Sequence, residues 1–310
     1  MARTHRFEPE VYYTTIGSHP PVLHVESGDT VETRTIESSG TDRAGKQVSE
    51  RGNPQTGPFY VEGAEPGDVL AVRFDRIVPD RSYGRTSALV AHNVVDPEFI
   101  PSLPRERGQG RWEIDLEKWT ATVVEPESTL GRLTIPLDPM LGCFGVAPSR
   151  GQAISCATSA QHGGNMDYRG FRQGVTVYLP VFVPGALFHL GDGHATQGDG
   201  EITGTGTEIP MEVTFTVWIH RKKQPIHWPR AEDDEFIMAV GNARPLDQAL
   251  QHATTELLRW LAEDYTLDLR GASLLLGQCI RYDVGNVFDP AYTMVAKVEK
   301  RLVEAYRMGQ

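Results

Sequence analysis

The chain has 310 residues, of which 41 are acidic and 30 are basic, so its formal net charge at pH 7 is −11. This excess of negative charge argues against nucleic acid and against an anionic membrane surface as partners. The length allows one large domain or two closely joined ones, and a hydrophobic fraction of 39% is ordinary for a globular protein. Glycine (31 residues) and proline (21 residues) are frequent, which favours turns and β structure.

The sequence carries no pattern typical of a membrane-spanning or secretory segment. The longest apolar run, residues 175–190, contains two prolines and a histidine and is too short to span a bilayer. The first residues lack the hydrophobic stretch of a signal peptide. The three cysteines form no CxxC pair, and an odd number suits a reducing compartment. We therefore predict a cytoplasmic protein.

The first 90 residues show the alternation of apolar and polar side chains that is typical of β-strands. Residues 22–25, 31–36 and 68–74 have this pattern and are bounded by turns rich in glycine and proline. Residues 37–58 between them are polar and rich in glycine, serine and threonine. They predict a long loop.

The middle of the chain begins with residues 97–118, which are charged and rich in proline and predict an irregular excursion. A second strand-rich block follows, from Trp119 to His220. Within it, residues 175–183 are apolar enough for a central strand. Residues 211–219 alternate, and their odd-numbered side chains are expected to face the core.

Helical periodicity appears only near the C-terminus. Apolar side chains recur at helical spacing over residues 245–265, and a second short helix is expected over residues 268–279. Residues 292–298 predict a strand that returns to the sheet. The pattern as a whole indicates a mainly β fold, a sandwich or jelly roll, with a helical pair near the C-terminus.

The segment Gly191–Glu201 is the strongest candidate for a functional site. Two Gly-Asp-Gly triplets bracket a histidine, and a glutamate follows at once. Glycine is unfavourable in helices and strands, so the segment predicts a sharply bent loop in which Asp192, His194, Asp199 and Glu201 converge. Carboxylate and imidazole groups are the ligands that divalent metals use. The alternative is a solvated turn whose aspartates cap local amides.

Two other segments offer polar groups in a glycine-rich setting. His162, Asn165 and Asp167 precede the apolar strand, and an extended strand over residues 174–183 would hold them roughly 30 Å from the Gly191–Glu201 loop. They meet that loop only if the strand is short or bent, if residues 184–190 fold back, or if a neighbouring subunit contributes. Their alternative is a Gly-Gly turn with an Asx cap. Residues 53–58 are expected either to position a ligand through Asn or Thr or to form a rigid turn.

Several known chemistries are excluded by motif. The sequence contains no HExxH, zinc-ribbon, P-loop or GxSxG pattern, and no GxGxxG follows a strand. Cys143 and Cys156 lie among small or apolar neighbours, so both are expected to be buried and inert.

Taken together, these segments resemble the acetamidase/formamidase family. The matching segments follow one another in the same order as in the family and are spread over nearly the whole chain. They are residues 53–58, 61–68, 142–148, 162–167, 178–181 and 191–201. The resemblance implies a β-sandwich related to jelly rolls with an added α/β portion. We expect residues 1–220 to form the β core and residues 221–310 to pack on it, either as a separate α/β portion or as part of one continuous domain. It also implies metal-assisted hydrolysis of short amides to carboxylate and ammonia, in a homo-oligomer.

The resemblance and the residue types lead to a hypothesis for the site. Asp167, Asp192 and His194 are expected to bind a divalent metal, with Asp199 as a fourth ligand or as a partner of His194. Glu201 is the expected general base, and Asn165 is expected to hydrogen-bond the amide or its oxyanion. Mixed nitrogen and oxygen ligands favour Zn²⁺, and the excess of carboxylates leaves Ca²⁺ or Mg²⁺ open. The substrate-binding residues are expected to be Asn53, Thr56 and His162.

Two other functions remain open from the sequence. The first is a non-catalytic jelly-roll module that binds metal or carbohydrate through its Gly-Asp loops. The second is a cupin-like metal enzyme using His189, His194 and Glu201, although the two histidines are separated by more residues than in a cupin. Release of ammonia from formamide or acetamide, with and without a chelator, separates an amidase from the non-catalytic module.

Overall fold

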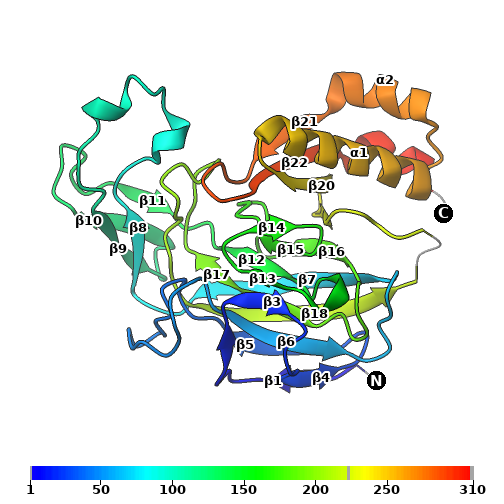
Figure 1. Cartoon of the computed structure of the whole chain (residues 1–310), viewed down its shortest axis with the longest axis horizontal. Coiled ribbons are helices and arrows are strands. Elements are labelled where there is room, and N and C mark those ends of the chain that lie inside the picture. Colours follow the sequence, from blue (N-terminus) through cyan, green and yellow to red (C-terminus); the bar gives the residue numbers. More distant parts are fainter. Residues whose placement is uncertain (1, 222–223, 308–310) are drawn as a thin grey trace.

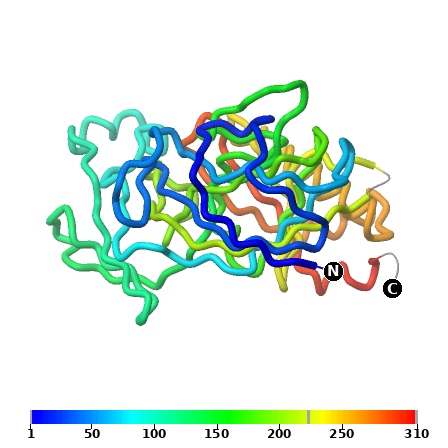
Figure 2. The backbone as a smooth tube through the Cα atoms, turned by 90° about the horizontal axis from the view of Figure 1, so that it is seen from below, coloured from blue at the N-terminus to red at the C-terminus, as the bar shows by residue number. Residues whose placement is uncertain are grey.

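The computed structural model describes residues 2–221 and 224–307. Two β-sheets pack face to face, a smaller sheet extends from one end, and two helices lie at the other end (Figure 1). The view from below again places residues 90–130 at the end opposite the C-terminal helices (Figure 2). The prediction of a mainly β sandwich with an α/β portion and a helical pair near the C-terminus is confirmed.

The larger sheet of the sandwich has nine strands, and it contains the longest strands of the fold. All its neighbours pair antiparallel except β1 and β5, which are parallel. In spatial order its strands are β1 (Thr4–Arg6), β5 (Thr30–Arg34), β18 (Met211–His220), β7 (Val69–Pro79), β16 (Thr176–Pro180), β19 (Arg230–Glu232), β20 (Phe236–Ala243), β22 (Tyr292–Glu299) and β21 (Arg281–Val284).

The second sheet contains the predicted site residues Asn165, Asp192 and His194. Its main path is β14 (Ser159–Ala160), β15 (Gly163–Asn165), β12 (Met140–Val146), β17 (Phe188–His194), β6 (Gln55–Val61) and β2 (Tyr12–Tyr13), and β4 (Leu23–Val25) also pairs with β6. A two-stranded ribbon, β13 (Ala153–Ser155) with β3 (Thr15–Gly17), lies beside it.

Aromatic side chains from both sheets form the core between them. Phe59 and Phe188 of the second sheet pack edge-to-face on Phe215 of the nine-stranded sheet, with ring centroids 5.2 and 5.4 Å apart. Phe74 and Phe144 make a similar contact at 5.1 Å. Such pairs add to the stabilisation from burying apolar area. The core is therefore the interface of a sandwich.

A four-stranded sheet forms the projecting end of the molecule. Its order is β11 (Thr134–Pro136), β10 (Thr120–Glu125), β9 (Gln109–Asp115) and β8 (Tyr83–Ser87). Strand β9 corrects the prediction of a wholly irregular segment over residues 97–118. Gly110, Trp112 and Ile114 alternate toward the interior of this sheet, but the charged residues between them hide the period in the sequence.

The C-terminal helices cover one face of the nine-stranded sheet beside β20 and β22. Helix α1 (Leu246–Asp264) and helix α2 (Leu269–Cys279) confirm the helical prediction, and the Asp268 side chain caps α2 by accepting from the Gly271 amide at 2.7 Å. Leu257 and Leu261 pack in one cluster with Ile237 and Ala296 of the sheet. Among the described helices, none is both long and apolar enough to cross a membrane.

Short helical turns complete the chain. They are η1 (His92–Val94), η2 (Ile100–Ser102), η3 (Ser149–Gly151), α3 (Lys300–Val303) and η4 (Glu304–Tyr306). The boundary between residues 220 and 221 stays a prediction. Strands from both sides of it, β18 and β19, belong to the same sheet.

Two loop predictions are corrected by strands. The predicted loop over residues 37–58 ends in β6, and the pairing of β6 with β17 is irregular opposite Pro58, which lets a proline stand inside the strand. Residues 191–194 belong to β17 rather than to a loop. Their glycines are needed for close packing, since a Cβ at Gly193 would lie 2.8 Å from the main-chain oxygen of Ile209.

Candidate functional site

Strand β12 brings the two predicted polar clusters together. Cys143 of β12 pairs with Asn165 of β15 on one side and with Gly191 of β17 on the other. The expected separation of roughly 30 Å does not arise. Strand β16 is short and belongs to the other sheet, and the chain turns at Ala186 and Leu187, both with φ of 58°. Two of the three conditions under which the clusters were expected to meet are therefore fulfilled within one chain: the strand is short, and the chain folds back after it.

The absence of a side chain at Gly142 makes room for two carboxylates. A Cβ at this position would lie 2.8 Å from Asp192 Oδ2 and would collide with Asp167 Oδ1. The two aspartates come from segments 25 residues apart in the sequence, and they face each other across β12. The local sequence Leu141–Cys143 thus shapes the site without adding a polar group.

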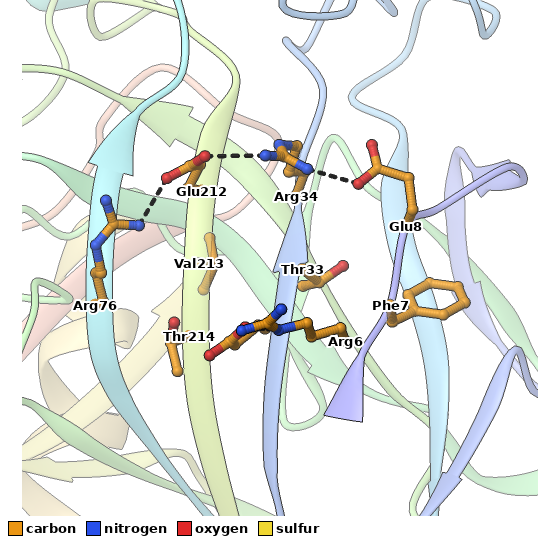
Figure 3. Close-up of a pocket in the computed structure, with 10 residues that line it drawn as sticks. Arg6, Phe7, Glu8, Thr33, Arg34, Arg76, Glu212, Val213 and Thr214 are labelled. Carbon is orange, nitrogen blue, oxygen red and sulfur yellow. Dashed lines mark hydrogen bonds and ion pairs between the residues drawn. The ribbon is translucent and has the colours of Figure 1, made fainter. Parts of the chain in front are cut away.

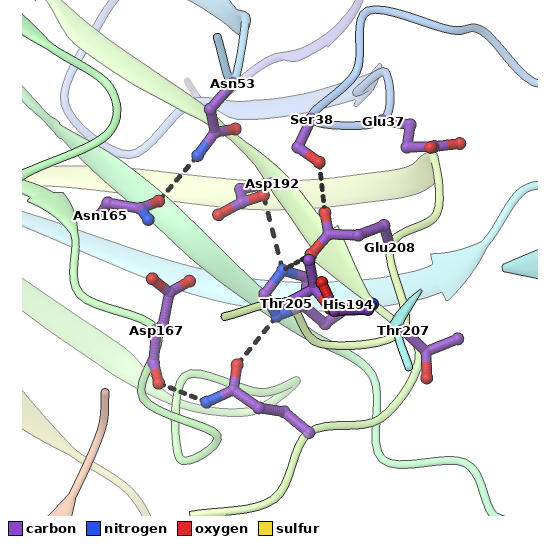
Figure 4. Close-up of polar contacts among 12 residues, drawn as sticks. Glu37, Ser38, Asn53, Asn165, Asp167, Asp192, His194, Thr205, Thr207 and Glu208 are labelled. Carbon is purple, nitrogen blue, oxygen red and sulfur yellow. Dashed lines mark hydrogen bonds and ion pairs between the residues drawn. The ribbon is translucent and has the colours of Figure 1, made fainter. Parts of the chain in front are cut away.

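His194 stands at the centre of the buried polar cluster (Figure 4). Its Nε2 lies 2.9 Å from Glu208 Oε1 and 3.5 Å from Asp192 Oδ1, but its orientation gives no hydrogen bond to either. Its Nδ1 lies 2.8 Å from Gln197 Oε1. The ring is 1% exposed, so neither nitrogen is satisfied by bulk water.

Two triads of side chains around His194 have the spacing of metal ligands. They are Asp167–His194–Glu201 and Asp192–His194–Glu208, and within each triad the ligand atoms lie within 4.8 Å of one another. Both oxygens of Asp167 are buried and accept no hydrogen bond from the described part of the chain. A buried carboxylate without a partner is costly, and a cation supplies the missing charge. The residues present therefore fit a divalent metal.

Four polar residues of the cluster also have an unusual backbone. Asn53, Asp167, Asp192 and Glu201 have φ values of 60°, 42°, 58° and 46°. Left-handed backbone is uncommon for residues other than glycine and costs free energy. Because four cluster residues have this backbone, the direction of their side chains is maintained at a cost in local stability.

Burial controls the pKa values of the carboxyl groups. Burial and then repulsion from Glu201 and Asp192 raise the pKa of Asp167 well above its ordinary value. Burial also raises the pKa of Glu201, with Asp289 adding to the rise and His194 opposing it. For Asp192, burial acts in the same direction but is outweighed by electrostatic attraction to His194, so its pKa is lowered.

A chain of amide side chains leads from one side of the cluster to the other. Asn53 Nδ2 donates to Asn165 Oδ1 at 2.7 Å, and Asn165 Nδ2 donates to Asp289 Oδ2 at 2.6 Å. These contacts fix which end of the Asn165 amide is the donor. Burial raises the pKa of Asp289 to about 6, and the hydrogen bond from Asn165 opposes this rise. One hydrogen of Asn165 Nδ2 remains to donate to a bound molecule.

Three predicted site residues lie elsewhere or are already engaged. Asp199 is 66% exposed and faces Arg169 at 3.7 Å, so the structure corrects its placement beside His194, which Gln197 occupies instead. The Thr56 hydroxyl donates to the main-chain oxygen of Arg34 at 2.8 Å. His162 is buried outside both triads, and burial lowers its pKa to about 4.

Glu208, Gln197 and Asp289 belong to the cluster but were not predicted. Glu208 reaches His194 through an isolated antiparallel bridge, and Ser38 Oγ donates to its Oε2 at 2.6 Å. Gln197 lies inside the predicted loop, but its neutral amide does not belong to the carboxylate and imidazole pattern that indicates a metal site. Asp289 comes from the C-terminal portion, where no glycine-rich pattern marks it.

A larger groove on the nine-stranded sheet differs from this cluster (Figure 3). It has a volume of about 580 Å³, and the charges along it are matched. Glu212 accepts from Arg34 at 3.0 Å and from Arg76 at 2.8 Å, and Arg34 also donates to Glu8 at 2.6 Å. The groove therefore offers neither an unpaired carboxylate nor a set of metal ligands among these residues.

Fold and site together define a β-sandwich protein with a buried acidic cluster around one histidine. The model of the acetamidase/formamidase family matches residues 151–245. The structure of an acetamidase from Bacillus halodurans is 31% identical with a TM-score of 0.81, covering 97% of this chain and 99% of that one. An acetamidase from Yersinia enterocolitica is 33% identical with a TM-score of 0.82, covering 96% and 92%. The chain belongs to the acetamidase/formamidase family, as the resemblance predicted.

One sequence relative matches over a shorter stretch. A formamidase from Methylophilus methylotrophus is 26% identical over 202 residues, which make up 49% of this chain and 47% of that protein. The chain thus spans about half the length of this formamidase.

Proposed function

We propose that this protein hydrolyses short aliphatic amides, of the formamide and acetamide class, to a carboxylate and ammonia. The observation that carries the proposal is the buried Asp167 carboxylate, which lies beside His194 and Glu201 and accepts no hydrogen bond within residues 2–221 and 224–307. Membership in the acetamidase/formamidase family supports the same reaction.

The proposed cofactor is a divalent metal held by Asp167, Asp192, His194 and Glu208. Glu208 replaces the exposed Asp199 in the predicted ligand set because it lies 2.9 Å from His194 Nε2. The imidazole nitrogen favours Zn²⁺, and the many carboxylates leave Ca²⁺ or Mg²⁺ as alternatives. When bound, such a cation polarises the amide carbonyl and lowers the pKa of water.

Glu201 is the proposed general base. A carboxylate oxygen of Glu201 takes a proton from water as the water oxygen bonds to the amide carbon. The same carboxyl then gives that proton to the nitrogen as the C–N bond breaks, so ammonia leaves and a carboxylic acid remains, which releases its own proton to give the carboxylate product. The buried surroundings raise the pKa of Glu201, which suits a group that must both accept and return a proton.

Asn165 is the proposed donor to the substrate. Its Oδ1 is held by Asn53 and one of its Nδ2 hydrogens by Asp289, so the amide is oriented before substrate arrives. The remaining hydrogen is placed to donate to the carbonyl oxygen as negative charge develops there. Asn53 thus acts through Asn165. Contacts of Thr56 and His162 with substrate, the cytoplasmic location and the homo-oligomeric state stay predictions.

The test is ammonia release from a panel of formamide, acetamide and propionamide, on protein whose metal content has been measured. The proposal expects release from at least one of these amides, with loss after chelation and recovery when metal is restored. Metal-loaded protein that releases no ammonia from any of them contradicts the amidase function and favours the non-catalytic binding module.

A further inference from the structure

Gln197 has hydrogen bonds that determine the direction of its side-chain amide. Its Nε2 donates to the main-chain oxygen of Asp167 at 2.5 Å and lies 3.3 Å from that of Gly285. Carbonyl oxygens only accept hydrogen bonds, so the nitrogen of the amide must face them. Its Oε1 is then the atom that faces His194 Nδ1 at 2.8 Å.

This direction determines which nitrogen of His194 carries hydrogen. An amide oxygen has no hydrogen to donate, so Nδ1 must be the donor in the contact with Gln197. In the neutral ring, Nε2 then carries the lone pair. That lone pair faces the carboxylates of Glu208 and Asp192, an arrangement that is unfavourable unless a second proton on Nε2 or a metal cation lies between them.

Gln197 also connects three segments of the chain. It follows β17 closely, it binds the main chain at Asp167, whose φ is 42°, and it reaches Gly285 at the start of the loop that carries Asp289. The residue is 8% exposed, so water is poorly placed to replace these bonds. One amide group thus relates the position of Asp167 to that of His194.

We propose that Gln197 is a positioning residue that fixes His194 in the tautomer protonated on Nδ1, so that Nε2 is presented to a divalent cation, and that holds Asp167 beside it. This inference rests on the metal site of the proposed function. It assigns a role to a neutral side chain that touches neither substrate nor metal.

The test compares three purified variants with the wild-type protein. Gln197→Met removes the amide and keeps the chain length, whereas Gln197→Glu keeps an acceptor for Nδ1 but loses the donor to Asp167. Gln152→Met is the matched control, because Gln152 is exposed on the surface. Thermal unfolding confirms that each variant is folded. The readouts are zinc affinity by competition with a chromophoric chelator, and the His194 tautomer from ¹⁵N-histidine NMR.

The expected loss of zinc affinity in Gln197→Met is about 10- to 100-fold, as for other partners of metal-binding histidines. Gln197→Glu retains the Nδ1-protonated tautomer and has an affinity between those of Gln197→Met and wild type, and Gln152→Met equals wild type. The proposal is overturned if Gln197→Met binds zinc within twofold of wild type, if wild-type His194 is not protonated on Nδ1, or if wild type binds no zinc.

Ammonia release is measured separately, so this inference and the proposed function fail in different ways. Zinc-loaded wild type that releases no ammonia, together with a weakened Gln197→Met site, contradicts the amidase function and supports the role of Gln197. An active wild type whose zinc affinity does not depend on Gln197 contradicts only the positioning role.

Discussion

The cluster around His194 and the groove on the nine-stranded sheet are both rich in carboxylates, but they balance charge differently. In the groove, Glu212 lies between two arginines, and the side chains are partly exposed to water. In the cluster, Asp167 is fully buried, and neither of its oxygens receives a hydrogen bond from the residues that the structure describes. The groove, with a volume of about 580 Å³, is therefore a surface on which the ion pairs are matched. The uncompensated carboxylate of Asp167 identifies the His194 cluster as the candidate site.

The largest effect on ammonia release is expected from Glu201→Gln, in the His194 cluster. The substitution keeps the size of the side chain and removes its ability to accept a proton, so ammonia release should fall by about 10²- to 10⁴-fold. Metal content should stay near that of wild type, since Glu201 is the proposed base and not a ligand. Glu117→Gln, at an exposed position, is the control. Full activity in Glu201→Gln would reject the assignment of the base.

Asp289→Asn is expected to change how stability depends on pH in the metal-free protein. Burial raises the pKa of Asp289 from 3.8 to about 6, so the folded state binds the proton more tightly than the unfolded state. The stability that this proton contributes is present below about pH 4 and is lost as pH rises through 6. The variant lacks this loss, so its free energy of unfolding relative to that of wild type should increase by about 2 kcal/mol between pH 4 and pH 7.

Chemical denaturation at a series of pH values measures this difference. A free energy of unfolding of Asp289→Asn minus that of wild type that stays constant, or that falls as pH rises, contradicts the raised pKa.

Asp167→Asn is expected to make the metal-free protein more stable while weakening metal binding. The neutral amide removes a buried charge that has no hydrogen-bond donor in the described part of the chain, so the free energy of unfolding should rise by about 2 kcal/mol. Asp199→Asn, at an exposed position beside Arg169, is the matched control and should change stability by less than about 0.5 kcal/mol. Destabilisation of the metal-free protein by Asp167→Asn would show that its charge is compensated within the fold.

The smallest effect is expected from Glu212→Gln in the surface groove. Hydrogen bonds from Arg76, together with those from Arg34, lower the pKa of Glu212, but its side chain is 32% exposed, and water screens the pairs. Urea denaturation should show a loss below about 1 kcal/mol, with unchanged metal content and ammonia release. A large loss of activity would mean that the groove, and not the His194 cluster, belongs to the site.

The sequence predicts those parts of the molecule in which the signal is local. Helix α1 and strand β18 follow from their periods of apolar residues, and β18 buries Met211, Val213, Phe215 and Val217 as expected. The hypothesis groups the two glycine-rich segments in one site, and the structure places the ligand atoms of Asp167 and His194 within 4.8 Å of one another. Their meeting depends on the pairing of β12 with both β15 and β17, which no local pattern contains.

The rest of the site depends on contacts between distant segments. Glu208 joins His194 through an isolated bridge, and Asp289 arrives on a loop that follows the C-terminal helices. Residues 191–194 were expected to avoid regular structure because of their glycines. Instead, Gly191 and Gly193 let a strand pack closely, since a Cβ at Gly191 would lie 2.8 Å from Gln55 Nε2.

The most direct test of the central claim is the metal content of wild type, His194→Ala and Glu212→Gln after purification and dialysis against zinc. The account predicts a stoichiometric, tightly held divalent ion in wild type and in Glu212→Gln, and its loss in His194→Ala, with the fold of each protein checked by circular dichroism. Equal metal content in wild type and a folded His194→Ala would contradict a cation site at the buried cluster.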